Sequence, residues 1–320
     1  MKKFLFKLSL FLAFPLAALA WARHGYFKMY PPERNYYLAA LDKIQLVRTQ
    51  ASPRLVFIGG SSAAFGIDSG LIAPRLGMHP VNMAVQVGLG LDFSLDSVEP
   101  WLRSGDVVVL ALEYEAYMRH YRALPEELAR FAETEPWLLR TFSLRQLKEI
   151  LDRGYALHLN RLLRASTGRP VRLLETGIEV YTRQGFDANG DFIAHHHQPP
   201  PVMAPGGSSA WIRFKDASQV REAVEHINRF AANSEARGAR IFISHPPLLD
   251  RVYDRSREPI GRLDELLRRE LRVPMLDKPE DSVFPMRLFY DTHYHLSAEG
   301  KRIRSEALAV RLQQALDRRP

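Results

Sequence analysis

The stretch that decides the fold is Arg54–Gly66, RLVFIGGSSAAFG, in which an apolar run meets two glycines and two serines. Its first part, Leu55–Ile58, has the β-branched and aromatic side chains of a strand buried on both faces. Gly59 and Gly60 have no Cβ, so they allow the sharp turn that ends such a strand. We therefore predict that Ser61 lies at the carboxyl edge of a parallel sheet, where open α/β sheets bind ligands.

A serine at this edge has two interpretations. It acts as a nucleophile, or it only begins a helix after a tight turn. Other motifs do not fit this stretch, because the glycines lack the Lys and Ser/Thr of a Walker A loop and do not follow GxGxxG. Ala63 also breaks the GxSxG nucleophile elbow of the α/β hydrolases.

The composition limits the classes of protein to consider. The chain has 320 residues, 46% of them hydrophobic and 25% charged, which suits one large globular domain. It has no cysteine, which excludes disulfides, thiolate metal sites and a cysteine nucleophile. The net charge of +8 favours anionic surfaces or polymers, but no nucleic-acid motif accompanies the dispersed basic residues. We expect no nucleic-acid partner.

The amino terminus, MKKFLFKLSLFLAFPLAALA, has the pattern of an export segment. A basic start, an apolar run and the small residues Ala18 and Ala20 are typical of a secretory signal peptide. The run Phe4–Trp21 is also nearly long enough to span a bilayer, so an uncleaved anchor is the alternative. We expect residues 1–25 to be a signal peptide or a membrane anchor. The rest, 26–320, would lie on the periplasmic side of a bacterial inner membrane or be secreted to the periplasm.

Strand and helix patterns alternate on both sides of a long middle segment. Further strands are predicted at Pro80–Val85, Val107–Leu112, Ile241–Ser244 and Val273–Leu276. Helices are predicted at Pro32–Thr49, Ser69–Arg75, Leu91–Leu102, Asp216–Ala236, Pro259–Leu271 and after Ser297. The fold class is therefore α/β, a three-layer sandwich around a parallel sheet of about five strands, with crossover helices on both faces.

Residues 116–215 interrupt the alternation, and we interpret them as a largely helical insertion. Ser143 and Gln146 form a capping box pattern there. Eight Arg or Lys residues lie between Arg140 and Arg172. They attract an anionic glycan or lipid headgroups, or they only form the solvent-exposed face of a helix. The run His195–His197 precedes three prolines, so we predict an exposed loop and no metal site.

The final block, FYDTHYHLSAEGKRIRSEAL at Phe289–Leu308, together with GGSS resembles the GDSL, or SGNH, hydrolases. In that family a strand runs into Gly-Asp-Ser, and a DxxHxxxxG block precedes the last helix. His295 keeps the family's spacing to Gly300, whereas Asp291 lies four residues before His295 instead of three. The resemblance implies a flavodoxin-like SGNH fold with Ser61 as nucleophile, His295 as general base and Asp291 orienting the imidazole.

The two middle blocks of the family depart further from the pattern. The second block corresponds to VGLGLDF, where the resemblance implies that the amides of Gly88 and Gly90 join that of Ser61 in holding an oxyanion. Ala84 sits where an NxG pattern would have its glycine. The third block, GxND, is missing, because Glu113–Glu115 reads EYE and cannot supply the asparagine donor.

Three more residues are predicted to support the site: Ser62, Glu113 and His293. Related envelope acetyltransferases carry a DxH pair, which His293 would match, but their pair precedes the serine block. Chain order and the spacing to Gly300 therefore favour His295 as the base.

The resemblance implies serine-dependent esterase or acyltransferase chemistry outside the cytoplasm. The expected substrates are acyl esters, chiefly acetyl, on a small molecule or a cell-envelope polysaccharide, and no cofactor is expected. The alternative is an envelope or polysaccharide-export factor that keeps the fold and binds an acylated glycan without turning it over. In either case the inner membrane is a partner through the amino-terminal segment.

Overall fold

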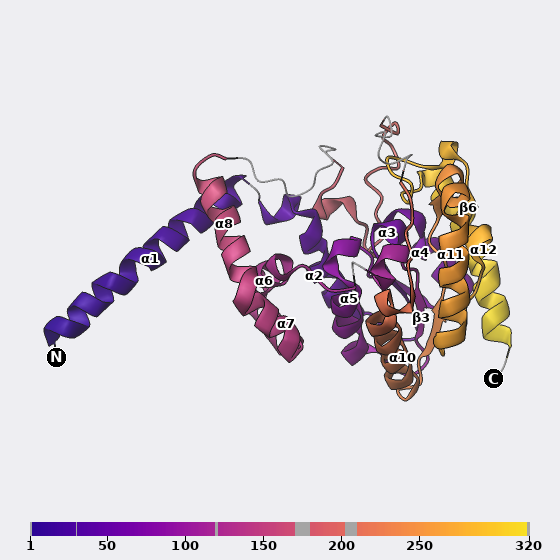
Figure 1. Cartoon of the computed structure of the whole chain (residues 1–320), viewed down its shortest axis with the longest axis horizontal. Coiled ribbons are helices and arrows are strands. Elements are labelled where there is room, and N and C mark those ends of the chain that lie inside the picture. Colours follow the sequence, from indigo (N-terminus) through magenta and orange to yellow (C-terminus); the bar gives the residue numbers. More distant parts are fainter. Residues whose placement is uncertain (1, 30, 119–120, 170–179, 202–209, 319–320) are drawn as a thin grey trace. The chain divides into compact units, whose positions relative to one another are not determined.

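The structure is a computed structural model that describes residues 2–29, 31–118, 121–169, 180–201 and 210–318 (Figure 1). The chain divides into two compact units. Unit 1 comprises Met1–Leu38 and Leu124–Arg183, and unit 2 comprises Ala39–Ala123 and Gln184–Pro320. The segment that the sequence presented as one insertion, 116–215, is divided between them.

Unit 2 is an α/β unit built on a parallel sheet. Its strands are β1 (Arg54–Ile58), β2 (His79–Asn82), β3 (Val107–Leu110) and β4 (Arg240–Ile243), in the order β2-β1-β3-β4. All three pairings are parallel. Because parallel strands all end at one edge, the residues after β1, β3 and β4 meet there. The α/β class with a parallel sheet is confirmed.

The sheet has four strands instead of about five. The predicted fifth strand, Val273–Leu276, forms only an isolated parallel bridge, in which Met275 pairs with Ile243 of β4. A short additional pair of parallel strands, β5 (Leu248–Leu249) and β6 (Val283–Phe284), forms a sheet of its own.

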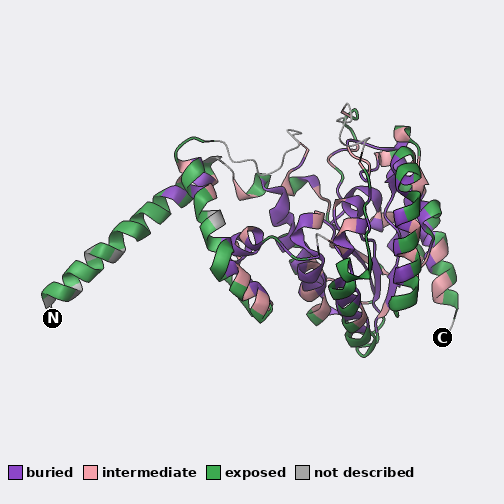
Figure 2. Ribbon diagram, viewed as in Figure 1, coloured by how far each residue is buried: buried purple, intermediate pink, exposed green. Residues whose placement is uncertain are grey.

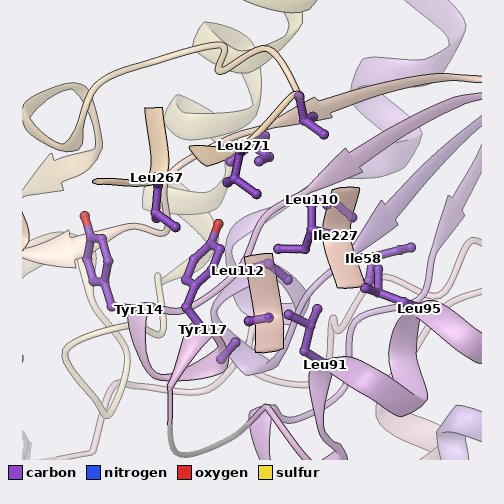
Figure 3. Packing of buried hydrophobic residues seen from close by; sticks show 14 of the residues in the cluster. Ile58, Leu91, Leu95, Leu110, Leu112, Tyr114, Tyr117, Ile227, Leu267 and Leu271 are labelled. Carbon is purple, nitrogen blue, oxygen red and sulfur yellow. The ribbon is translucent and has the colours of Figure 1, made fainter. Parts of the chain in front are cut away.

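The main core lies between the sheet and the helices of one face. Ile58 and Leu110 from the strands pack in one cluster with Leu91 and Leu95 of α5 and Ile227 of α10 (Figure 3). The alternate strand residues are buried as well, as the burial of all five β1 positions shows. Burial on both faces explains why the strands are continuous apolar runs.

The helices of unit 2 differ from the predictions mainly at their ends. They are α2 (Ala39–Thr49), α3 (Ser61–Gly66), α4 (Ser69–Arg75), α5 (Leu91–Val98), α10 (Arg221–Glu235), α11 (Asp250–Glu270) and α12 (Ala298–Asp317). The prediction that α11 begins at Pro259 is wrong, because the helix starts directly after β5 and contains the proline. The segment before α2 forms two 3-10 turns, Pro32–Arg34 and Tyr36–Leu38. Ser297 caps α12 as predicted, accepting from the Gly300 N–H at 3.3 Å.

Buried charged residues hold the loop 184–201, with which the second part of unit 2 begins. The Asp191 carboxylate accepts from the Ser69 backbone N–H at 2.7 Å and from the Asn82 side chain at 2.7 Å. The Lys43 ammonium donates to the carbonyls of Asn82, at 3.0 Å, and Gly190, at 2.6 Å. These bonds join the loop to α4 and to the end of β2.

Unit 1 is helical. It contains α1 (Lys2–Met29), α6 (Pro125–Thr134), α7 (Leu144–Glu149) and α8 (Tyr155–Ser166), with a π-helical turn, Ile150–Gly154, joining the last two. The predicted capping box of Ser143 and Gln146 is present at the start of α7.

The helix α1 is exposed along most of its length (Figure 2). By length and composition Phe6–Lys28 is able to cross a membrane, as a signal sequence or an anchor would be. The predicted apolar export segment is therefore a helix.

Candidate functional site

The turn between β1 and α3 leaves no room for side chains at its glycines. A methyl group at Gly59 would lie 2.3 Å from the carbonyl oxygen of Ala111. A methyl group at Gly60 would lie 2.6 Å from both carboxylate oxygens of Glu113 and 2.7 Å from the backbone nitrogen of Val87. The two glycines are therefore required by close packing, and they place Ser61 at the first position of α3.

Glu113 holds the backbone of this turn. Its Oε2 accepts from the Gly60 N–H at 3.1 Å, and its Oε1 accepts from the Ser62 N–H at 2.7 Å. The side chain is only 1% exposed, and burial raises the pKa of the Glu113 carboxyl, while the Ser62 N–H lowers it. Glu113 is thus an acceptor that supports the serine turn.

GGSS has no acidic residue of its own, and a carboxylate from a distant segment lies beside it. Glu113, three residues after the end of β3, occupies the volume that a side chain at position 60 would need. A carboxyl group is therefore present beside the serine turn, although it comes from another part of the sequence.

The two serines of the turn have different environments. Ser61 is half-buried, whereas Ser62 is fully buried and its N–H is bound to Glu113. Within the described residues, the Ser61 N–H donates to no acceptor. Ser61 is therefore the serine that a ligand can reach.

Asp291 and His295 lie in contact in the turn before α12. His295 Nδ1 is 2.7 Å from Asp291 Oδ1, and the two residues are only 7% and 8% exposed, respectively. The backbone braces the turn, since the Tyr290 N–H donates to the His295 carbonyl at 2.7 Å. A carboxylate on Nδ1 fixes the tautomer of the imidazole. The turn thus brings the two side chains into contact although Asp291 lies four residues before His295.

Phe65 connects this pair to the serine helix. Its ring is stacked on the His295 imidazole, with 4.1 Å between centroids and 9° between planes. Residues 61 and 65 are one turn apart on α3, so Ser61 and Phe65 lie on the same face of the helix. His295 is therefore held against the helix face that begins with Ser61.

The glycines of the second block are engaged within their own loop. The Gly88 N–H donates to the Gln86 side chain, and the Gly90 N–H donates to the Val87 carbonyl at 3.1 Å. The structure therefore does not present the predicted oxyanion amides for a ligand. The Val87 nitrogen instead lies against Gly60, and its N–H has no acceptor among the residues described.

The α12 helix fixes the far end of α3 with two buried cations. Lys301 Nζ donates to the Phe192 carbonyl at 2.8 Å, and a contact of 3.4 Å joins it to the Ala64 carbonyl. Arg304 donates to the Gly66 carbonyl at 3.2 Å. Burial lowers the pKa of the Lys301 ammonium, the largest effect on that group. The serine helix is thus held at both ends.

The prediction of an exposed loop at His195–His197 is wrong for its first histidine. His195 is 2% exposed and lies against the ring of Phe65, 4.6 Å between centroids, and that of Phe192. Burial, followed by the positive charge of Lys301, lowers the pKa of His195 to about 2, so the ring is neutral at ordinary pH. No group of metal-binding side chains occurs in the described part of the chain.

The described contacts of His293 differ from those of His295. It is half-buried, its carbonyl accepts from the Leu249 N–H at 3.1 Å, and its ring contacts Tyr294. Three residues around the site, Val87, Phe65 and Lys301, were not predicted from the sequence. Phe65 carried a usable signal, since it follows Ser61 by one helical turn; the other two carried none.

A cavity of about 730 Å³ lies away from these residues, lined by Arg240, Phe242, Met275 and the end of α12. It sits at the start of β4, the opposite end of the strand from the serine edge, and includes no predicted site residue.

Comparison with known protein families found no family model that matches the chain, and comparison with curated proteins found no matching relative.

Proposed function

We propose that this protein is a serine-dependent esterase or acyltransferase that acts on acyl esters outside the cytoplasm, with a divergent SGNH-type site. The observation that carries the proposal is the Asp291–His295 pair, whose imidazole is stacked on Phe65 one helical turn from Ser61. A free serine is a weak nucleophile and needs a base with a fixed tautomer. These residues supply the serine, the base and the orienting carboxylate.

In the proposed reaction, the Ser61 hydroxyl oxygen attacks the ester carbonyl while His295 Nε2 takes the hydroxyl proton. Asp291 stabilises the imidazolium through Nδ1–H. The alcohol leaves with the proton from His295, and the acyl group remains on Ser61. Water completes hydrolysis, or a second alcohol accepts the acyl group and completes transfer; in each case His295 takes and then returns a proton.

The oxyanion would be held by the N–H groups of Ser61 and Val87. Both belong to segments that meet at Gly60, and neither has a protein acceptor within the described residues. Backbone donors aimed at the developing charge are the usual source of such stabilisation. This assignment replaces Gly88 and Gly90.

A second candidate is the non-catalytic factor that binds an acylated glycan. It is favoured by Glu113, whose carboxylate is placed beside the serine turn where the family has an asparagine donor. An ionised carboxylate cannot donate to an oxyanion and opposes a second negative charge nearby.

For location, we propose that α1 is retained as an anchor with Met1–Lys3 inside the cell. The residues beyond α1 then lie on the periplasmic side. The acylated substrate would be a component of the cell envelope, because that is what this side of the membrane presents.

Covalent labelling by a fluorophosphonate separates the two candidates, since only an activated serine reacts quickly. We expect labelling of the native chain and of Ser62→Ala, and none of Ser61→Ala or His295→Ala. A panel of acetyl and longer acyl esters then identifies the substrate. An unlabelled native chain that still binds acylated glycan would establish the second candidate instead.

A further inference from the structure

The outer face of α7 and α8 in unit 1 carries a row of exposed apolar side chains. Leu144, Leu151, Tyr155, Leu159 and Leu163, here called the α7–α8 stripe, are 87%, 73%, 48%, 41% and 45% exposed. The last four recur every fourth residue, so they lie on one face of the helix. Figure 2 shows this part of the unit mostly in the colour of exposed residues.

The stripe is not the packing face of these helices. The packing face is formed by other residues, among them Ile150, Gly154, Leu162 and Ala165, all of which are buried. Exposed apolar patches on a folded protein usually mark a surface that binds something. The stripe is therefore a second face, which none of the described residues covers.

The charges around the stripe are mainly positive. Arg153, Arg164 and Arg169 are exposed. The acidic Asp152 is bonded to Lys148 four residues earlier. An apolar stripe flanked by basic residues is the composition of helices that lie in the headgroup region of anionic membranes.

The position of α1 in the same unit supports this interpretation. Ala22 and Tyr26 of α1 are fully buried against Leu162 and Ala165 of α8. The approach is close at Gly25, where a methyl group would lie 3.0 Å from the Ser166 Cα. These contacts begin directly after the apolar run that ends with the exposed Trp21, and at 1.5 Å rise per residue they lie within about 8 Å of it. Tryptophan at that point is typical of a membrane interface.

We propose that the α7–α8 stripe lies on the anionic bilayer in which α1 is anchored, with its leucines in the headgroup region and its arginines on lipid phosphates. The anchor holds the stripe at the membrane, so the association is intramolecular and a weak intrinsic affinity is sufficient. The exposed arginines are thus assigned to lipid headgroups, because the membrane that holds α1 is the anionic surface nearest to them. The inference is independent of the catalytic proposal.

The absence of cysteine makes the test direct, because one introduced cysteine gives one labelling position. Leu151→Cys and Leu159→Cys place an environment-sensitive fluorophore on the stripe. Val310→Cys is the matched control, since Val310 is an apolar residue that is 56% exposed on α12 in unit 2. The full chain, with α1 verified by intact mass, is reconstituted into vesicles of phosphatidylcholine and phosphatidylglycerol, with or without brominated acyl chains.

We expect emission from both stripe labels to be blue-shifted and quenched roughly twofold by brominated lipid, with no change at the control position. A water-exposed stripe label would overturn the proposal. A blue-shifted label that lipid does not quench would overturn it too, since it would show burial against protein, such as a second copy.

The charge contribution is tested on the Leu159→Cys background. Arg153→Glu with Arg164→Glu should reduce lipid quenching, and Arg153→Lys with Arg164→Lys should preserve it. Vesicles of phosphatidylcholine alone should reproduce the loss in the unaltered sequence. Quenching that is insensitive to all three changes would overturn the assignment of the arginines to lipid phosphates.

Discussion

The Glu113 carboxylate gives a prediction that depends on the contact between the segments that follow β1 and β3. Glu113→Ala removes the acceptor of two backbone N–H groups, those of Gly60 and Ser62. Gly60→Asp introduces a second carboxylate beside the same turn. In the native chain that change is prevented, because the new side chain would begin 2.6 Å from the Glu113 oxygens.

The magnitudes follow from these contacts. A hydrogen bond to a charged acceptor contributes about 1.5–3 kcal/mol, so two lost bonds cost about 3–6 kcal/mol. Removing a buried carboxylate recovers part of this cost, since burial raises the pKa of Glu113 and so disfavours its charged form. We expect a net loss of roughly 3 kcal/mol for Glu113→Ala, which lowers the midpoint of thermal unfolding by about 6–12 °C. Gly60→Asp alone should be worse, because it combines a steric clash with a second buried charge.

The assay is the thermal unfolding midpoint of the two single variants and the double variant in one detergent. If the two positions share one carboxylate site, the double variant should be more stable than Gly60→Asp alone, a clear departure from additivity. Additive losses would refute the reasoning, because they would mean that the volume beside Gly60 is not the one occupied by Glu113.

Four further predictions concern the base, its support, the pH dependence and the location. His295→Ala should reduce ester turnover by several powers of ten and His293→Ala by about tenfold or less, as measured by kinetics on one activated acetyl ester; the reverse ranking would make His293 the base. Phe65→Leu should lower kcat more than it raises KM, because the imidazole loses its stacking partner, and an unchanged kcat would exclude a positioning role. Because burial raises the folded-state pKa of Glu113, the folded chain holds the Glu113 proton more tightly than the unfolded chain does, so the stability of the native chain relative to Glu113→Gln should fall as pH rises from the unfolded-state pKa through the folded-state pKa; denaturant unfolding across pH 4–8 would show it, and a flat difference would count against it. A reporter enzyme that is active only outside the cytoplasm should be active when it is fused after Pro320. Activity of a reporter that works only in the cytoplasm would contradict the proposed anchor orientation.

Local pattern was enough to predict the strand and turn around Ser61. The apolar run, the two glycines and the serine follow one another directly, so the structure of this stretch depends mainly on residues that are close in sequence. The same holds for the turn at Asp291–His295 and for the Ser297 cap, whose partners lie within four residues. The catalytic role of these residues remains a prediction.

Contacts between distant segments were not predictable in this way. Glu113 was predicted to support the site and to lack a donor for an oxyanion. Its acceptance of N–H groups from the turn after β1 was not predictable, because that turn lies about 50 residues earlier in the sequence. His195 was predicted to be exposed because prolines follow it, but packing against the rings of Phe65 and Phe192 buries it. Gly88 and Gly90 were predicted to bind the oxyanion because they lack a Cβ. That criterion does not show whether the N–H group already donates to an acceptor within the protein, as that of Gly88 does.

The order of strands in the sheet has a consequence for how the chain folds as it is synthesised. β1, β2 and β3 all lie before residue 111, but β3 pairs on its other side with β4, roughly 130 residues later. While the intervening residues are still being synthesised, Val107–Leu110 is an unpaired strand edge made only of Val and Leu. Such an edge readily pairs with other chains. Fragments that stop before Arg240 should therefore aggregate, and the rate at which the second half emerges sets how long the nascent protein is at risk.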